Sequence, residues 1–286
     1  MIKIKIEKPF KLEDTITCGQ IFRFFKMEDG SFDIILKDRV INVYEKNNYL
    51  YVSSNNEDDL KSVVMNYFDL DNDYSKINEY LLKQDKKLDD AINFSKGLMM
   101  IKQDPFETIM EYIISANNSV PSIASALNNI ALKYGKKVMF NNKEYYLFPQ
   151  YKDLKDVKES DLRECKVGFR DKYLKNIIDK LNNNELDLDS FYSMDTKEAL
   201  DKLMENIGIG PKVASCILLF AYQKYDVFPV DTWVKKVMKT KYNIEGEKNI
   251  RFFASITYGK YSGIAIQYLF NYGRNSNWLM KKFVIE

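Results

Sequence analysis

A lysine beside a glycine-rich turn has the chemistry of a nucleophile. The run Gly208-Ile209-Gly210-Pro211-Lys212 joins two apolar stretches, and Pro211 suits the first turn of a helix, where no N–H is needed. Lys212 is then expected at the second helical position, where the helix dipole disfavours positive charge and favours the neutral amine. A neutral amine has the lone pair that a nucleophile needs. The alternative interpretation is a solvated lysine or a simple phosphate contact.

A carboxylate follows at a fixed distance along the chain. Asp231 lies 19 residues after Lys212 and directly after Phe228-Pro229-Val230. Asp before Thr-Trp-Val-Lys is an ordinary helix N-cap. If the same carboxylate faces the glycine turn, it can stabilise positive charge at a breaking glycosidic bond and assist proton transfer. The two roles are compatible, and both are expected.

Gly208 and Gly210 fit a phosphate contact. Glycines at a helix N-terminus let a phosphate approach the backbone N–H groups, and such a contact holds DNA without reading its sequence. Lysine- and arginine-rich runs at 162–182 and 232–241 flank this helix–hairpin–helix pattern. Taken alone, the turn fits an ordinary connection between packed helices, and the runs fit solvated helix faces. Together they favour nucleic-acid binding.

Composition restricts the remaining chemistry. The 286 residues include no histidine and three scattered cysteines, Cys18, Cys165 and Cys216. These residues exclude a zinc enzyme, a Ser-His-Asp or Cys-His hydrolase, an iron–sulfur cluster and a disulfide framework. We therefore expect no metal ligands and no cofactor. The start MIKIKIEKPF does not resemble a secretory signal, and no run approaches the ~18 apolar residues of a membrane span. A cytoplasmic protein with no membrane partner is expected.

The elements that must position these residues change in kind along the chain. Segments 2–7, 20–26, 31–37, 39–45 and 49–54 are predicted strands of an antiparallel meander, with turns at Asp29-Gly30 and 46–48. From about Glu57 the apolar period is helical, with helices predicted near 104–118, 121–134, 170–182, 196–206, 211–224, 231–240 and 262–272. The fold class is α+β. We expect an antiparallel β domain with flanking helices over 1–95 and a helical domain over 96–286, with the helix–hairpin–helix at about 203–225.

These stretches resemble a known enzyme family. GIGPKVAS, with VFPVD after it, resembles the helix–hairpin–helix (HhH-GPD) DNA glycosylase superfamily. CGQIFRF (18–24), KQDPFETIMEYIISANN (102–118), VGFRDKY (167–173) and GKYSGIAIQYLF (259–270) are similar to blocks of 8-oxoguanine DNA glycosylase. The resemblance runs through most of the chain. It implies a TBP-like N-terminal sheet, an all-α helix–hairpin–helix domain, and a bifunctional glycosylase/AP lyase that flips out and excises 8-oxoguanine and then nicks the strand by β-elimination.

The resemblance also implies roles for residues around the flipped base. Lys212 would be the Schiff-base nucleophile and Asp231 its carboxylate partner. The carbonyl of Gly19 would accept the hydrogen that N7 carries in 8-oxoguanine but not in guanine. Leaving a buried acceptor unpaired costs ~1–3 kcal/mol, which would disfavour the normal base. Cys216 and Phe270 would sandwich the base.

On the DNA side, the resemblance implies that Asn117 fills the space that the flipped nucleotide leaves. Phe169 would wedge into the stack, and Arg170 would contact the partner base. The expected partner is double-stranded DNA containing oxidised guanine, bound by a monomer. The hairpin carbonyls are a candidate site for a structural monovalent cation.

Three positions depart from the family pattern. Ser122 stands where an arginine typically bonds the cytosine opposite the lesion, so we expect weaker preference for that cytosine. The glutamine that reads the flipped purine aligns with Ile266, although the adjacent Gln267 could take its role. Trp233 stands where some relatives carry a histidine.

Two other classes stay open at this point. An alkylpurine glycosylase shares the two-domain plan but works with the aspartate alone, so Lys212 argues against it. A noncatalytic helix–hairpin–helix protein would only grip DNA, and it leaves the other matching blocks unexplained. Endonuclease III relatives usually carry a four-cysteine cluster, which three scattered cysteines cannot form.

Overall fold

The first 54 residues contain an antiparallel sheet of five strands in the order β1-β5-β4-β3-β2. The computed structural model describes residues 1–276 and 278. The strands are β1 (Ile2–Lys5), β2 (Phe24–Lys26), β3 (Phe32–Ile35), β4 (Val40–Lys46) and β5 (Tyr49–Ser54). Both predicted turns are confirmed: Gly30 has φ +82°, and Asn47 and Asn48 have φ of 52° and 60°, values that suit a two-residue hairpin.

The predicted meander is right for β2 to β5 and wrong for β1. β1 pairs with β5, and the helix α1 (Leu12–Thr17) separates β1 from β2. Of the predicted strand 20–26, only residues 24–26 form a strand in the structure. The sequence prediction did not include α1, because a helix of six residues is too short to show a helical period.

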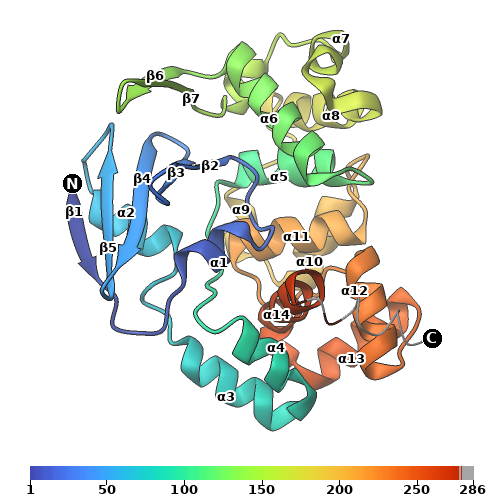
Figure 1. Cartoon of the computed structure of the whole chain (residues 1–286). Helices are drawn as coiled ribbons and strands as arrows, with labels where there is room; N and C mark the ends of the chain where they lie inside the picture. The colour runs from blue at the N-terminus through green and yellow to red at the C-terminus, as the bar shows by residue number, and fades with distance from the viewer. Residues whose placement is uncertain (277, 279–286) are drawn as a thin grey trace.

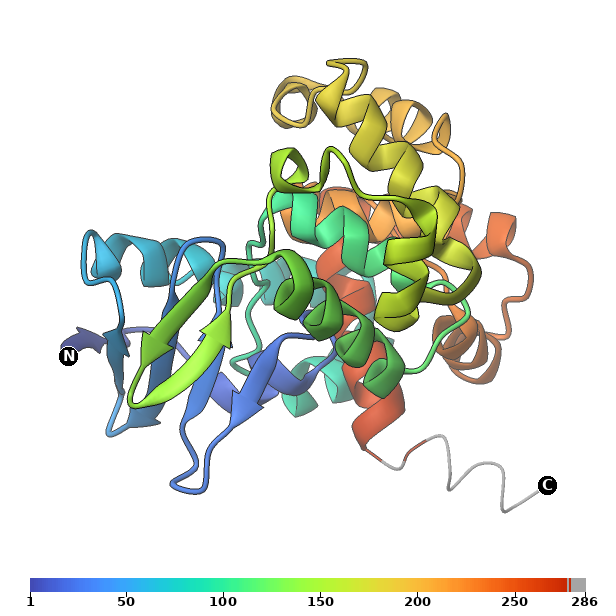
Figure 2. The same ribbon diagram turned by 90° about the horizontal axis from the view of Figure 1, so that it is seen from above.

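Two layers cover the sheet. The side chains of Phe32, Ile34 and Val43 are buried in the main core that the sheet shares with the helices. On the other face, Ile35 and Val40 pack against the hairpin of β6 (Lys137–Phe140) and β7 (Lys143–Tyr146) (Figure 2). The sequence prediction did not include this hairpin.

The seven predicted helices are confirmed. They correspond to α5 (Pro105–Ser115), α6 (Val120–Tyr134), α8 (Asp171–Asn182), α10 (Thr196–Met204), α11 (Pro211–Tyr222), α12 (Thr232–Val237) and α14 (Ser262–Asn275). The structure adds α2 (Leu60–Tyr67), α3 (Tyr74–Gln84), α4 (Asp89–Phe94), α7 (Glu159–Leu162), α9 (Ser190–Ser193) and α13 (Glu247–Thr257). The expected α+β class, a sheet domain followed by a mostly helical one, is confirmed.

Helix α11 is the centre of the helical part (Figure 1). Its residues 213–222 are all buried, and it packs against α5 and α10. Helix α14 contacts both α12 and α4, so the end of the chain returns to the segment that follows the sheet. A single core connects the two parts, and the boundary near residue 95 stays a prediction. Within residues 1–276 and 278, no helix is both long and apolar enough to cross a membrane.

Candidate active site

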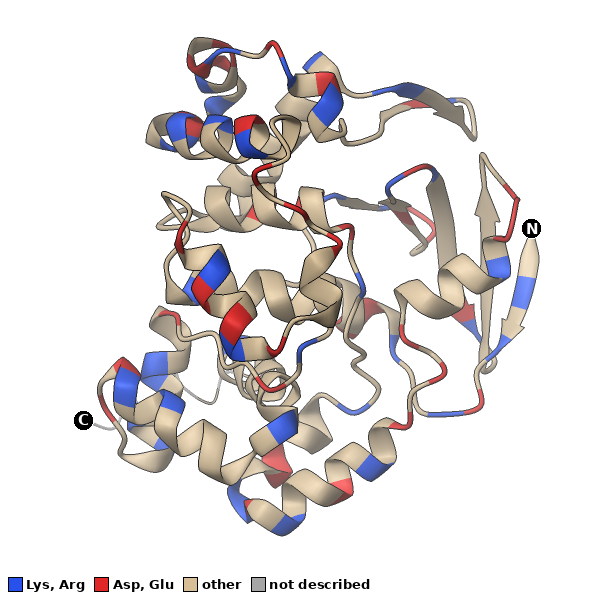
Figure 3. Ribbon diagram, turned by 180° about the vertical axis from the view of Figure 1, so that it is seen from behind, with Lys and Arg blue, Asp and Glu red and all other residues tan. Residues whose placement is uncertain are grey.

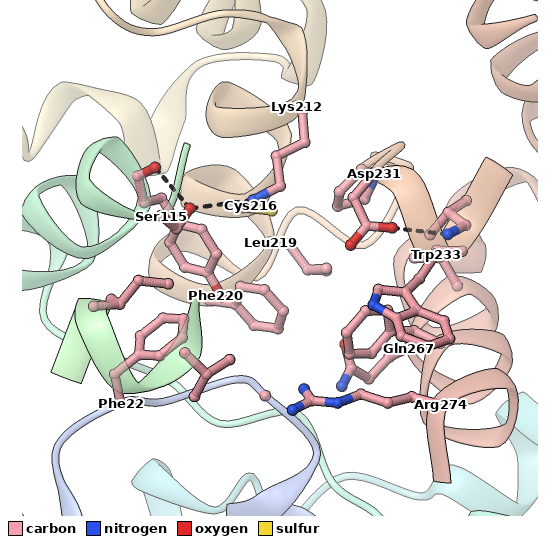
Figure 4. A pocket seen from close by; sticks show the side chains of 18 of the residues that line it. Phe22, Ser115, Lys212, Cys216, Leu219, Phe220, Asp231, Trp233, Gln267 and Arg274 are labelled. Atoms are coloured by element: carbon pink, nitrogen blue, oxygen red, sulfur yellow. Dashed lines mark hydrogen bonds between the residues drawn. The ribbon is translucent and has the colours of Figure 1, made fainter. Parts of the chain in front are cut away.

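A cavity of about 370 Å³ lies where α11, α12 and α14 meet the loop that follows α1 (Figure 4). It brings together side chains that are far apart in the sequence. The lining includes these residues of the predicted site: Gly19, Lys212, Cys216, Asp231, Ile266, Gln267 and Phe270. The structure therefore gathers the predicted catalytic pair and the predicted base-binding residues around one cavity.

Lys212 is held by the end of helix α5. It is the second residue of α11, as predicted, and its side chain is half-buried. Its Nζ donates to Ser115 Oγ at 3.2 Å, and Ser115 Oγ in turn donates to the Tyr112 carbonyl at 2.8 Å. Nζ also lies 5.2 Å from the centre of the Tyr112 ring. Lys212 forms no ion pair with a carboxylate in the described part of the chain. Ser115 therefore holds the amine in place without an ion pair.

Asp231 lies on the opposite wall, and the N-cap prediction is confirmed. One carboxylate oxygen accepts from the Val234 N–H at 2.7 Å at the start of α12. This bond fixes the side chain, and Figure 4 shows the carboxylate directed into the space that Lys212 also faces. A fixed carboxylate stabilises positive charge that develops in this space without first having to reorganise.

Gly19 lines one side of the cavity, and hydrogen bonds of the neighbouring Gln20 side chain hold its backbone in place. The buried Gln20 side chain donates to the Thr15 and Met99 carbonyls and accepts from the Ile101 N–H. Gly19 has φ +89°, a conformation that favours glycine. A β-carbon there would lie 3.4 Å from Phe270 Cε1, so the absence of a side chain leaves the corner open.

Cys216 and Phe270 also line the cavity, from α11 and α14. Burial raises the pKa of the Cys216 thiol, so the group is a neutral, apolar surface at physiological pH. A neutral thiol and an aromatic ring suit a flat apolar ligand. Their predicted role as the two sides of a base sandwich remains a prediction.

Ile266 and Gln267, the two candidates for reading the edge of the base, both line the cavity but differ in their capacity for hydrogen bonding. Ile266 has no polar side-chain atom. Gln267 is buried and donates from Nε2 to the Cys18 carbonyl at 3.3 Å, which ties α14 to the Gly19 loop. Gln267 therefore helps to hold the loop in place.

The glycine hairpin has the geometry that its sequence predicts. Gly208 has φ +85°, and a β-carbon there would lie 2.4 Å from the Tyr173 ring, which only glycine avoids. Gly210 is the residue before α11, and a β-carbon there would meet nothing within 4 Å. The preceding helix α10 ends at Met204, two residues earlier than predicted, because the chain needs those residues to turn.

The predicted DNA-contacting side chains lie outside the cavity. Phe169 is 55% exposed, and its ring lies 4.5 Å from the Arg170 guanidinium carbon. Arg170 is buried, and its guanidinium donates to the carbonyls of Ala116 and Asn117. Asn117 is exposed with φ +52°. Arg170 thus supports the Asn117 loop, and its contact with a partner base remains a prediction.

Ser122 is exposed near the start of α6. Its Oγ lies 2.8 Å from Ser119 Oγ, and its N–H donates to the same hydroxyl. The side chain is too short to reach far from the helix. No arginine occupies this position.

Acidic side chains partly neutralise the two basic runs. In the 232–241 run, Lys235 pairs with Glu247 at 2.6 Å and Lys239 with Glu245 at 3.1 Å. In the other run, Arg163 pairs with Asp171 at 2.5 Å. Figure 3 shows red positions among the blue ones on these helices. The surface charge therefore alternates more than the two sequence runs suggest.

Sequence reasoning missed some residues of the site. Ser115 and Tyr112 hold the lysine from a helix about 100 residues away, and no local pattern marks them. Arg274 also lines the cavity, one turn beyond Phe270 on α14. Its spacing from Phe270 is typical of residues on one face of a helix, so its place beside Phe270 was predictable, but its position at the cavity was not.

Comparison with known proteins places the chain in a family. Residues 1–109 match the N-terminal domain of 8-oxoguanine DNA glycosylase, and residues 110–255 match the HhH-GPD superfamily of base excision DNA repair proteins. A probable N-glycosylase/DNA lyase of Methanothermobacter thermautotrophicus is 31% identical over 245 residues, which cover 77% of each protein.

Solved structures show the same relationship. The 8-oxoguanine glycosylase/lyase of Clostridium acetobutylicum, crystallised with double-stranded DNA containing cytosine opposite 8-oxoG, is 39% identical with a TM-score of 0.90, covering 97% of this chain and 99% of that one. A 3-methyladenine DNA glycosylase from Archaeoglobus fulgidus has a TM-score of 0.80 over 96% of this chain and 99% of its own, at 22% identity, and shares the fold alone. The chain belongs to the 8-oxoguanine DNA glycosylase family of the HhH-GPD superfamily.

Proposed function

We propose that this protein is a bifunctional DNA glycosylase/AP lyase that excises 8-oxoguanine from double-stranded DNA. The observation that carries the proposal is the position of Lys212. Its amine lies at a cavity, is held by a neutral hydroxyl and has no carboxylate partner among the described residues, while the fixed Asp231 faces it across that cavity. An unpaired amine opposite a fixed carboxylate suits attack on a carbon that gains positive character as its bond to a base breaks.

The reaction follows from these two groups. The Nζ lone pair of Lys212 attacks C1′ of the flipped nucleotide while the C1′–N9 bond breaks, and the base leaves with the bonding electrons and takes up a proton. The nitrogen loses one proton, the C1′–O4′ bond breaks as O4′ takes up a proton, and a protonated imine forms between Lys212 and C1′. Loss of a C2′ proton then expels the 3′ phosphate by β-elimination. Asp231 stabilises the positive charge in the first step and is placed to accept or return protons.

The lesion is recognised at the Gly19 corner. A carbonyl accepts hydrogen and cannot donate, so it pairs with the N7–H of 8-oxoguanine but not with the bare N7 of guanine. Gln20 and Gln267 hold this loop in place from both sides. Cys216 and Phe270 supply the apolar surfaces against which the base lies. The energetic cost of extruding the base, a few kcal/mol, is offset by these contacts and by Phe169 entering the stack.

The other candidate functions fit less well. An alkylpurine glycosylase has this fold, but its chemistry gives no role to an amine at position 212. A protein that only grips DNA needs neither the cavity nor the Asp231 carboxylate inside it. A monomer in the cytoplasm, acting on DNA with oxidised guanine, completes the proposal.

The test compares two lysines in the same helical position. Lys248 is the second residue of α13, as Lys212 is of α11, but it is exposed and lies outside the cavity. On an 8-oxoguanine duplex with borohydride, the parent and Lys248→Gln form a covalent adduct and release the base, whereas Lys212→Gln forms none. An adduct from Lys212→Gln, or no excision of 8-oxoguanine by the parent, contradicts the proposal.

Asp231→Asn separates charge from structure. Asparagine caps a helix about as well as aspartate, so the fold and α12 stay intact. Base release falls by roughly 10²- to 10³-fold, the usual cost of losing one preorganised electrostatic group. Single-turnover excision rates, with thermal unfolding as the control, measure the two effects separately.

A further inference from the structure

Arg274 differs from the other arginines of the chain in having no polar partner. Within residues 1–276 and 278, its guanidinium forms neither an ion pair nor a hydrogen bond, and its guanidinium carbon lies 5.9 Å from the centre of the Phe270 ring. The remaining five all bond to protein groups: Arg23, Arg39, Arg163, Arg170 and Arg251. The donors of Arg274 are therefore free for a ligand.

The guanidinium of Arg274 lies beside Gly19. A β-carbon on Gly19 would lie 3.3 Å from Arg274 Nη1 and 3.4 Å from Phe270 Cε1, so the three residues form one corner of the cavity. Figure 4 shows the Arg274 side chain extending along the cavity at the end away from Lys212. The other edge-reading candidates do not compete, because Ile266 is apolar and the amide of Gln267 donates to the Cys18 carbonyl.

The free donors match one oxygen of the base. The outer edge of 8-oxoguanine carries an acceptor at O6, a hydrogen at N7 and an acceptor at O8. If the Gly19 carbonyl takes the N7 hydrogen, a donor-only guanidinium beside it pairs with one of the two flanking oxygens. C1′ must lie near Lys212, and O8 is on the sugar side of the base. The oxygen at the far end, where Arg274 lies, is O6.

We propose that Arg274 reads O6 of the flipped base and thereby selects oxidised guanine over oxidised adenine. The inference rests on the proposed function. Adenine carries an amino group at position 6, which donates hydrogen as the guanidinium does. The mismatch places two donors against each other, and a good contact between arginine and a base edge is worth about 1–3 kcal/mol of discrimination, or roughly 5- to 150-fold.

The experiment uses three lesions that share the oxidised N7–C8 edge. These are 8-oxoguanine, 8-oxohypoxanthine, which keeps O6 but lacks the 2-amino group, and 8-oxoadenine, which lacks both. Single-turnover excision is measured for the parent, Arg274→Met and the charge control Lys248→Met. The parent and Lys248→Met prefer 8-oxohypoxanthine to 8-oxoadenine by roughly ten-fold or more, and Arg274→Met brings this ratio close to one.

An abasic-site duplex distinguishes base reading from a phosphate contact. It has no base to read, so Arg274→Met loses much less lyase activity there than excision activity on 8-oxoguanine. Equal losses on the abasic site and on every lesion indicate a phosphate contact and overturn the inference, as does an unchanged ratio of 8-oxohypoxanthine to 8-oxoadenine excision. Failure of the parent to excise 8-oxoguanine overturns the proposed function instead.

Discussion

The Gly19 corner offers a sharp test, because a methyl group there acts in two ways. Gly19→Ala forces a residue with a β-carbon to adopt φ +89°, which costs roughly 1–2 kcal/mol of stability. The methyl also lies 3.3 Å from Arg274 Nη1, which must shift slightly, and it touches Phe270 Cε1 at 3.4 Å. The cavity corner is then partly filled, and the carbonyl that is proposed to accept the N7 hydrogen shifts.

Gly30 provides a matched control for the backbone strain. It has φ +82°, and a β-carbon there would meet nothing within 4 Å. Gly30→Ala should therefore lose a similar roughly 1–2 kcal/mol of unfolding free energy without any change at the cavity.

Misaligning the N7–H contact costs a further ~1–3 kcal/mol in the complex, so Gly19→Ala should excise 8-oxoguanine roughly 5- to 150-fold more slowly than Gly30→Ala. Chemical denaturation measures the stability loss, and single-turnover excision measures the second effect. Abasic-site cleavage, which involves no base, should fall far less. If Gly19→Ala excises the base as fast as Gly30→Ala does, the Gly19 carbonyl does not contact the lesion.

Three further predictions concern other parts of the molecule. Burial and the nearby Glu107 raise the pKa of Glu111 well above its usual range, so the folded state holds a proton that the unfolded state loses above about pH 4.5. Stability therefore falls as the pH rises from that value towards the raised pKa, and Glu111→Gln should raise Tm more at pH 8 than at pH 5, by about 2–4 °C for each kcal/mol. Equal gains at both pH values in calorimetry would show that Glu111 is ionised in the fold. Ser122→Arg should increase the preference for cytosine over adenine opposite the lesion by roughly ten-fold, because a guanidinium adds bidentate donors at that position. Parallel cleavage assays with the four opposite bases measure this preference. An unchanged preference would show that position 122 lies away from the partner base. Phe169→Ala should leave Tm nearly unchanged, because the ring is 55% exposed, but should slow excision roughly ten-fold through lost stacking, and an unchanged excision rate would remove the wedge role.

The sequence was most informative where structure depends on local interactions. The N-cap role of Asp231, the position of Lys212 at the start of α11 and the hairpin glycines follow from neighbouring residues, and all three are found in the structure. The β6–β7 hairpin also depends on a local signal, because its turn residues Asn141 and Asn142 adopt φ of 48° and 60°. The sequence prediction missed it because helical patterns surround this short segment.

The rest depends on contacts between distant segments. Ser115 meets Lys212 only because α5 packs against α11, and Arg274 meets Gly19 only because α14 returns to the loop after α1. Pairing of β1 with β5 is likewise decided by which strand edge the chain leaves open. No local sequence pattern indicates these contacts, because they form only when distant segments pack together.

The proposed mechanism requires that the Lys212 amine attacks C1′ of the lesion nucleotide. Peptide mapping by mass spectrometry, after borohydride trapping on an 8-oxoguanine duplex, locates that bond directly. The adduct should be found on the peptide that contains Lys212 and on no other. An adduct on a different lysine or on the N-terminus, or release of the base with no adduct, would contradict this mechanism.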